Sequence, residues 1–475
     1  MSVNTMVKIN WLEEVGKRKE QLIEDAQQFL RIKSVLDEET ATPTAPFGEG
    51  IDQALHYLLK KGRKDGFNTK NVDGFAGHLE LGGGKEIVGV LCHIDVVPEG
   101  EGWTSAPYSA EIRDGKIFAR GSLDDKGPTM AAYYALKIVK ELGLPLSKRV
   151  RMIIGTDEES NWRCVEHYFK HEEMPTIGFA PDADFPIIFA EKGIANFDLV
   201  QTQTFNNMRP EEYSLQSFSS GQRYNMVPED AIAEIAITDA SIMIEQYHQY
   251  LTRKQLKGSA FHKRGIVTLH LHGKSAHGME PKEGINAGVY LANFLQAQNL
   301  DSNAAQFVSF VSSYFFEDSR GEKLGVAYSD KVTQDLTINV GKLQYSKENG
   351  GKIGINLRYP GTTDMGNTKK KIEHICERNS FEVKNYSDSK PHHVDEDHYL
   401  IQTLKKVYEQ QTGEEATLLA IGGGTYARSL KNGVAFGPLF PERIDVAHQK
   451  DEYIIIDDLV KATAMYAQAI YELAK

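Results

Sequence analysis

Three short apolar runs in the first half of the chain each lead directly into side chains that can bind metal ions. The runs span 87–92, 151–155 and 177–180, and the groups that follow them are His93 and Asp95, Glu158 and Glu159, and Asp182. Imidazole and carboxylate groups are common ligands of zinc, manganese and cobalt ions. The three cysteines form no CxxC pair, so any metal site in this chain must depend on His, Asp and Glu.

The elements between these groups explain why the groups should meet. The three apolar runs are typical of buried strands, and residues 129–142 predict a helix with Pro128 in its first turn. Strands that alternate with helices indicate an α/β layer with a largely parallel sheet. In such sheets, ligands bind outside the carboxyl ends of the strands. We therefore expect the side chains that follow the three runs to converge on one crevice.

Each of these groups has a simpler explanation when it is taken alone. A single His after a strand usually serves packing, an Asp before a helix such as Asp125 is usually an N-cap, and two Glu residues on a loop are usually solvated. The repetition at three strand ends favours the metal site, because several carboxylates buried together are costly unless a cation neutralises them. The segment 120–127 adds Asp124 at the start of the helix.

The rest of the chain predicts a second kind of architecture between two α/β parts. An amphipathic helix is expected over 11–32, and helices over 240–256 and 285–297 separate alternating strands such as 266–272 and 353–358. A helix over 400–411, a glycine turn at 422–424, a strand over 434–436 and a helix from Asp457 follow. We predict an α/β fold with a mixed, largely parallel sheet between helices, formed by 1–191 and 391–475, and an inserted α+β domain over 192–390.

Composition excludes several classes of function. The 475 residues carry a formal net charge of −12, which argues against a nucleic-acid partner. The N-terminal residues lack the apolar core of a secretory signal, and no apolar run is long enough to span a bilayer, so no membrane partner is expected. Cys92, Cys164 and Cys376 fit a reducing compartment. A cytoplasmic protein is the expectation.

Five motifs in a fixed order carry a resemblance to a known family. They are HIDVVP at 93–98, GSLDDKGP at 121–128, TDEES at 156–160, APDADFP at 180–186 and AHQKDE at 447–452. Together they resemble the aminoacylase/dipeptidase family of two-metal peptidases, and within it the dipeptidases of lactic acid bacteria. The resemblance spans nearly the whole chain, and it implies a catalytic α/β domain with an inserted lid domain.

The resemblance implies a role for each group at the strand ends. His93 and Asp182 would bind one divalent ion, Glu159 and His448 the other, and Asp124 would bridge both; zinc is expected, with manganese and cobalt as alternatives. Asp95 would accept the remaining imidazole N–H of His93. Glu158 would be the general base that activates a metal-bridged water, since neighbouring side chains point in different directions. In similar enzymes the peptide bond that joins Asp124 to Asp125 is cis.

The middle domain would supply the residues that bind substrate. His277, in GKSAHGMEP, resembles a lid histidine that stabilises the oxyanion, whereas His270 and His272 are assigned to the sheet surface. Asn225 and Arg358 resemble lid residues that bind the substrate backbone and its terminal carboxylate. The backbone N–H groups of Gly423, Gly424 and Thr425 are further candidates for that carboxylate, although a simple tight turn explains this segment equally well.

The second metal ligand indicates the substrate class. Similar dipeptidases and aminopeptidases have Asp at the position of Asp182, whereas acylases and desuccinylases usually have Glu. We expect a dipeptidase that cleaves unblocked dipeptides, with an N-acyl or N-succinyl amino acid amidohydrolase as the alternative. A binding protein with a degenerate site is a third possibility, but every expected ligand is present in the sequence.

The length of the middle segment leads to a prediction about the oligomeric state. About 200 residues lie in this segment, within the range of a whole domain, and in similar enzymes an enlarged lid takes the place of a partner subunit's lid. We therefore predict a monomer. Size-exclusion chromatography with light scattering checks this, and a dimer at low micromolar concentration would contradict it.

Overall fold

A computed structural model describes residues 9–202 and 213–475 of the chain. These residues form two compact units. Unit 1 comprises the chain up to Ala190 together with 393–420 and 425–475, and unit 2 comprises 191–392 and 421–424. The segment 421–424, which the sequence analysis grouped with the C-terminal part, therefore belongs to unit 2. No helix within the described ranges combines the length and hydrophobicity needed to cross a bilayer.

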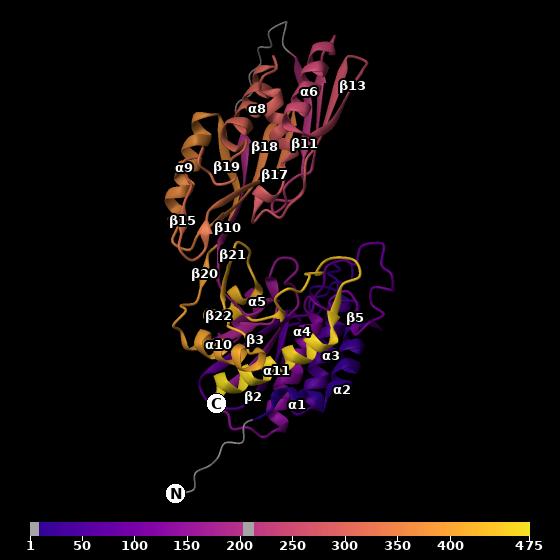
Figure 1. Cartoon of the computed structure of the whole chain (residues 1–475), viewed down its shortest axis with the longest axis vertical. Helices are drawn as coiled ribbons and strands as arrows, with labels where there is room; N and C mark the ends of the chain where they lie inside the picture. Colours follow the sequence, from indigo (N-terminus) through magenta and orange to yellow (C-terminus); the bar gives the residue numbers. More distant parts are fainter. Residues whose placement is uncertain (1–8, 203–212) are drawn as a thin grey trace. The chain divides into compact units, whose positions relative to one another are not determined.

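Unit 1 is built around a nine-stranded mixed sheet (Figure 1). Its strands follow the order β1-β2-β6-β3-β7-β22-β9-β20, and β21 pairs with β9. The elements are α1 (Trp11–Gly16), α2 (Lys19–Leu30), α3 (Glu49–Lys64), β1 (Asn68–Val72), β2 (Ala76–Leu81), β3 (Ile87–His93), β4 (Glu111–Arg113), β5 (Lys116–Phe118), α4 (Lys126–Glu141), β6 (Arg149–Gly155), α5 (Arg163–His171), β7 (Ile177–Ala180), β8 (Ala183–Asp184), β9 (Ile187–Glu191), β20 (His392–His393), α10 (Tyr399–Thr412), β21 (Leu418–Ile421), a 3-10 turn (Tyr426–Ser429), β22 (Gly433–Ala435), β23 (Pro438–Leu439), β24 (Tyr453–Ile455) and α11 (Ile456–Ala474).

The centre of this sheet is parallel, as the apolar runs predict. Strands β6, β3, β7 and β22 run parallel, whereas β2 joins β6 in the antiparallel sense. Strand β3 is buried along its whole length, and the buried helices α4 and α11 pack against each other in the same core. The predicted α/β class with a mixed, largely parallel sheet is confirmed.

Two helix predictions needed correction. The helix expected over 11–32 is broken into α1 and α2 at residues 17–18. Helix α4 begins at Lys126, three residues before the predicted start, and Asp125 precedes it without capping it through its side chain. The Asp125 carboxylate instead accepts hydrogen bonds from the backbone N–H of His93 at 3.1 Å and the hydroxyl of Thr129 at 3.4 Å. Asp125 therefore occupies the N-cap position of α4, but its carboxylate bonds to the end of β3 and not to the first turn of backbone N–H groups.

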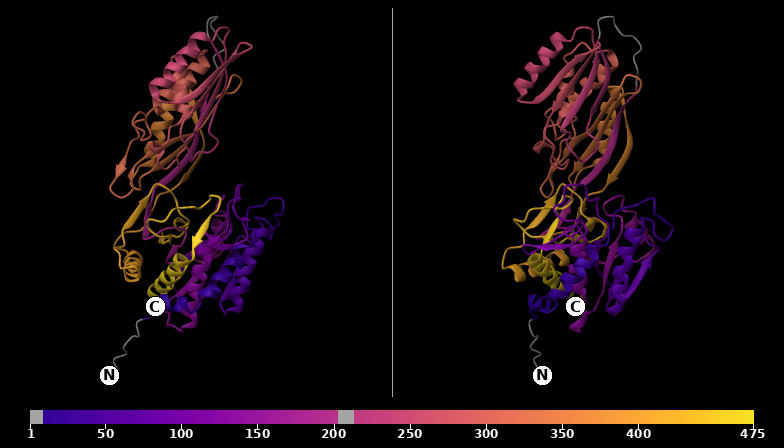
Figure 2. Two further views of the ribbon diagram at one scale, coloured as in Figure 1. Left: turned by 45° about the vertical axis from the view of Figure 1, so that its right-hand side comes forward. Right: turned by 90° about the vertical axis from the view of Figure 1, so that its right-hand side faces the viewer.

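Unit 2 is an antiparallel sheet of eight strands with helices on one face (Figure 2). The strand order is β13-β14-β12-β11-β17-β18-β10-β19, which confirms the predicted α+β character. The elements are β10 (Gly193–Gln201), β11 (Ser214–Ser220), β12 (Asp230–Ala236), α6 (Ser241–Lys254), β13 (Lys257–Lys263), β14 (Ile266–His272), a 3-10 turn (Pro281–Glu283), α7 (Ala287–Leu295), α8 (Ser302–Phe315), β15 (Ser329–Asp330), β16 (Gln334–Asp335), β17 (Thr337–Ser346), β18 (Gly350–Tyr359), α9 (Met365–Arg378) and β19 (Phe381–Ser389). Burial alternates along β12 and β14, so their second face is open to solvent.

A buried glutamate holds the segment that leads into α4. One carboxylate oxygen of Glu452 accepts from the backbone N–H groups of Leu123 and Asp124 at 2.9 and 3.0 Å. The other accepts from Arg120 Nη1 at 2.6 Å and from the backbone N–H of Gly121 at 3.2 Å. Both charged side chains are almost fully buried. The hydrogen bonds to Glu452 fix the backbone at Asp124. The pairing of β24 with β5 holds the neighbouring segments together.

Replacing Glu452 by Gln should destabilise unit 1 strongly, because Arg120 would remain buried without its counter-charge. Burial raises the pKa of Glu452 to about 7, so the carboxyl is ionised at pH 8 and the measurement belongs there. We expect Glu452→Gln to lower the free energy of unfolding at pH 8 by about 3 kcal/mol, as for other broken buried pairs. The exposed Glu442→Gln is the matched control and should change it by less than about 0.5 kcal/mol. Equal effects of the two variants in urea unfolding would contradict this assignment.

Candidate metal centre and substrate-binding residues

The ends of β3 and β7 bring His93 close to two carboxylates. His93 Nε2 lies 3.0 Å from Asp124 Oδ1 and 3.5 Å from Asp182 Oδ1. The ring of His93 is completely buried, whereas Asp124 and Asp182 keep a small exposed area. The other ring nitrogen, Nδ1, lies 3.0 Å from the backbone oxygen of Asp95 and donates its proton there, so Nε2 is the nitrogen that faces the two carboxylates.

The second oxygen of Asp124 faces a different histidine. His448 Nε2 lies 2.9 Å from Asp124 Oδ2 and 2.9 Å from Glu159 Oε1. His448 comes from the loop before β24, where its backbone adopts a left-handed conformation with φ of 64°. Asp124 therefore lies between two separate His–carboxylate groups, with one oxygen toward each. The peptide bond that joins Asp124 to Asp125 is cis, as the resemblance implies.

The charge balance of this cluster fits a site for cations. Burial, with the nearby Asp124, raises the pKa of Glu159 to about 7 and that of Asp182 to about 6. Hydrogen bonds with Asp124 and Glu159 raise the pKa of His448 to about 11, so a proton provides positive charge between them. A divalent ion in the same place would supply more charge to the same oxygen and nitrogen atoms. Ligand atoms of His93, Asp124 and Glu159 all lie within 4.8 Å of one another, as do those of His93, Asp125 and Asp182.

Asp95 organises the loop that carries the two glutamates. Its carboxylate accepts from the backbone N–H of Glu158 at 3.1 Å and of Glu159 at 2.9 Å. Oδ1 of this carboxylate, the expected acceptor for the His93 ring, lies 3.4 Å from Nδ1, and the shorter contact of Nδ1 is to the Asp95 backbone oxygen. A single side chain thus links the end of β3 to the segment that follows β6.

Glu158 and Glu159 point to different partners. Glu159 contacts His448, whereas Glu158 Oε2 lies 4.0 Å from His93 Nε2, beyond hydrogen-bond distance. Burial raises the pKa of Glu158 well above its ordinary value. A carboxyl group that is near the cluster, protonatable and free of a short contact to either histidine has the properties of a proton carrier.

Three residues near the cluster were missed or misjudged from the sequence. Glu452 lies in the same AHQKDE motif as His448, and that proximity is the signal that could have revealed it. Asp125 contributes one buried oxygen without a hydrogen-bond partner. Tyr426 is buried and packs edge-on against the His93 ring, with ring centroids 5.8 Å apart. No sequence pattern predicts Tyr426, because its contact depends on the packing of a distant turn.

In unit 2, the predicted substrate-binding residues Asn225 and His277 lie side by side. Met226 forms an isolated bridge with His277, and the backbone N–H of Gly278 donates to the Asn225 backbone oxygen at 2.7 Å. The backbone N–H of Met279 donates to His277 Nδ1 at 3.1 Å, so the neutral ring carries its proton on Nε2. Burial and the charge of Arg358 lower the pKa of His277, which favours this neutral form.

Arg358 connects β18 to the glycine turn. Its Nη1 donates to the Gly422 backbone oxygen at 2.8 Å, and its Nε donates to Asn356 Oδ1 at 3.0 Å. A Cβ atom on Gly423 would lie 3.9 Å from the same Nη1. Unit 2 thus places Arg358 beside Gly422 and Gly423, while Gly424 ends the segment and Thr425 begins the next part of unit 1.

His270 and His272 lie on the surface of the antiparallel sheet, as expected. Both face Asp230, whose Oδ1 lies 3.1 Å from His270 Nε2 and 2.6 Å from His272 Nδ1. They form a separate group of potential ligands within unit 2.

The chain matches a known peptidase family. Residues 89–472 match the model of peptidase family M20/M25/M40. The chain is 58% identical to "Putative dipeptidase YtjP" of Bacillus subtilis over 98% of this chain and all of that one, and 45% identical to "Putative dipeptidase SSP1012" of Staphylococcus saprophyticus over 98% of this chain and 99% of that one.

Two solved structures share the fold at low sequence identity. Human carnosine dipeptidase 1 superposes with a TM-score of 0.56 at 15% identity, covering 98% of each chain. Aminopeptidase PepT of Bacillus cereus superposes with a TM-score of 0.57 at 15% identity, covering 96% of this chain and 99% of that one. The family match spans most of the chain and includes every group of the cluster around Asp124. The chain belongs to peptidase family M20/M25/M40 and is a metallopeptidase.

Proposed function

We propose that this protein is a dipeptidase that hydrolyses the peptide bond of unblocked dipeptides with the help of two divalent metal ions. The observation that carries the proposal is the orientation of Asp124, whose two oxygens face His93 and His448 separately. His93 and Asp182 would hold one ion, His448 and Glu159 the other, and Asp124 would contact both. When bound, such ions polarise a carbonyl oxygen and lower the pKa of a water molecule.

The identity of the ions follows from the ligand types. Two imidazole nitrogens and three carboxylates suit zinc, manganese and cobalt, and we propose zinc as the ion in the active protein. The Nδ1 proton of His93 is directed at the Asp95 backbone oxygen. This orientation supports Nε2 as the atom that binds the metal ion.

Glu158 is the proposed general base. It removes a proton from the attacking water and then donates that proton to the leaving amine, for which its raised pKa is suitable. His277 would donate its Nε2 proton to the oxygen of the substrate carbonyl as negative charge develops there, and its neutral form supports this role.

Further polar groups, in unit 2 and at Thr425 of unit 1, would position the substrate. Arg358 and the backbone N–H groups of Gly423, Gly424 and Thr425 would bind the terminal carboxylate, and Asn225 would bind the substrate backbone. The hydrogen bond from Arg358 to Gly422 supports this grouping, because it holds the guanidinium beside the glycine turn. The free amine of the substrate would lie near Asp182.

The two adjacent glutamates provide a matched pair for testing the general base. Glu158→Gln should retain the metal ions and lower kcat by about 10²- to 10⁴-fold, the usual contribution of a general base. Glu159→Gln should instead lower metal content, because Glu159 contacts His448 beside Asp124. Metal analysis and kinetics on both variants check this. Turnover near the wild-type value in Glu158→Gln would remove Glu158 from its role.

The substrate class is tested with a free and a blocked amine. Ala-Leu should be cleaved with a kcat/KM at least about 100-fold above that of N-acetyl-Leu, which corresponds to nearly 3 kcal/mol of discrimination. A chelator should abolish the activity, and zinc, manganese or cobalt should restore it. Preference for N-acetyl or N-succinyl amino acids would instead establish the alternative function, an amidohydrolase with the same metal centre.

A further inference from the structure

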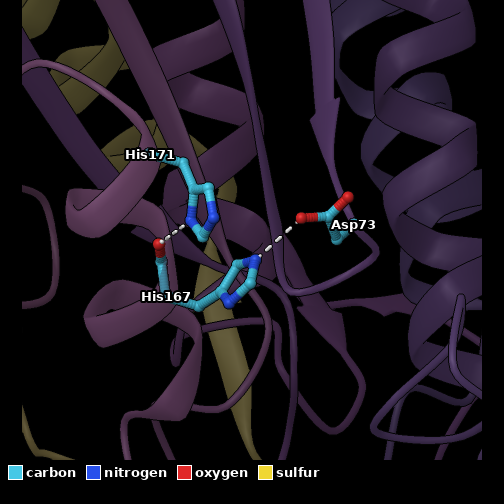
Figure 3. A group of neighbouring side chains, drawn as sticks. All are labelled: Asp73, His167 and His171. Carbon is cyan, nitrogen blue, oxygen red and sulfur yellow. Dashed lines mark hydrogen bonds and ion pairs between the residues drawn. The ribbon is translucent and has the colours of Figure 1, made fainter.

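A second set of metal ligands lies in unit 1, in residues that the proposed catalytic centre does not use. Asp73 occupies the turn between β1 and β2, and His167 and His171 lie on α5, with His171 as its last residue (Figure 3). His167 Nε2 is 2.9 Å from Asp73 Oδ2, and one ligand atom from each of the three residues lies within 4.8 Å of the others. The segments that carry them are separated by about ninety residues of sequence, so the fold alone assembles this group.

The helix geometry orients the two imidazoles. Residues four apart share one face of a helix, and the rings of His167 and His171 lie 4.3 Å apart. The Nδ1 atom of His171 lies 2.9 Å from the His167 backbone oxygen. That bond places the ring proton on Nδ1 and leaves the lone pair of Nε2 for a ligand, an arrangement typical of metal-binding histidines. Figure 3 shows this nitrogen on the side of the ring that faces His167 and Asp73.

Packing also restrains the other two residues. The His167 ring stacks on Phe75, with centroids 4.2 Å apart and planes 19° from parallel. Asp73 and Gly74 both have positive φ angles, and a Cβ atom on Gly74 would lie 2.1 Å from the Thr44 backbone oxygen. The backbone of the turn is therefore closely packed beside Asp73, and position 74 requires glycine.

Two imidazole nitrogens and one carboxylate oxygen select a particular kind of ion. Magnesium and calcium prefer sites made of oxygen atoms, whereas zinc, nickel and copper accept imidazole readily. We propose that Asp73, His167 and His171 bind one transition-metal dication, with water in the remaining coordination positions. Binding would link the β1–β2 turn to the end of α5.

The surface group in unit 2 is a weaker candidate for the same role. There a single oxygen of Asp230 lies within hydrogen-bond distance of both His270 and His272. One carboxylate oxygen is thus already hydrogen-bonded to a nitrogen of each ring. This group provides the matched control, because it also consists of two nearby histidines and one aspartate.

The test uses the full chain loaded with its catalytic metal ions, dialysed against increasing concentrations of Zn²⁺. Wild-type protein should bind one more zinc ion than the double variant His167→Ala/His171→Ala. Asp73→Asn should weaken that binding by about tenfold or more. Residues that only hydrogen-bond to a metal ligand already change metal affinity by about 10- to 100-fold. His270→Ala/His272→Ala should bind the same number of ions as the wild type.

A single substitution and an X-ray measurement test the same site independently. If the double alanine variant fails to fold, His171→Gln alone should weaken the additional binding by at least about tenfold. Anomalous scattering at the zinc edge should locate the extra ion between Asp73 and α5. Equal zinc content of the wild type and the His167→Ala/His171→Ala variant would overturn the proposal, as would loss of the extra ion from the His270→Ala/His272→Ala variant.

Discussion

The carboxylate of Asp124 lies between two imidazoles that are far apart in the sequence of unit 1. The surrounding structure depends on that contact. His93 ends β3, whereas His448 lies in the loop before β24, more than 350 residues later. Each oxygen of Asp124 has a separate partner, so the position of one carboxylate determines the spacing of both groups. Several acidic side chains share this buried region, and they are tolerable there because positive charge lies among them.

Hydrogen bonds from backbone N–H groups to two buried carboxylates hold the segments of this cluster. Glu452 accepts from the backbone N–H groups of Gly121, Leu123 and Asp124. Asp95 accepts from the backbone N–H groups of Glu158 and Glu159. Buried carboxylates are costly unless such donors satisfy them. Two acidic residues that are not proposed ligands therefore fix the segments that carry three of the acidic residues near the metal centre. The precision of the site comes from this surrounding set of hydrogen bonds.

Unit 2 brings together a different kind of chemistry. Its antiparallel sheet places Arg358 beside the glycine turn, and a backbone bridge places Asn225 beside His277. These groups are hydrogen-bond donors, suited to an anionic or developing negative charge, whereas unit 1 presents mainly carboxylates.

The sequence by itself determined the parallel strands, the class of each unit and the type of chemistry, because these depend on local hydrophobic periodicity and on short motifs. Strand β7 and strand β14 agree with their predicted ranges to the residue. Local patterns did not reveal the break between α1 and α2 or the hydrogen bond of the Asp125 carboxylate to the end of β3. Tertiary structure alone decided which atoms face each other: the backbone oxygen of Asp95 toward His93, the ion pair of Arg120 with Glu452, and the meeting of Asp73 with α5. These contacts join residues whose relative positions depend on how whole elements pack, and no local pattern encodes that packing.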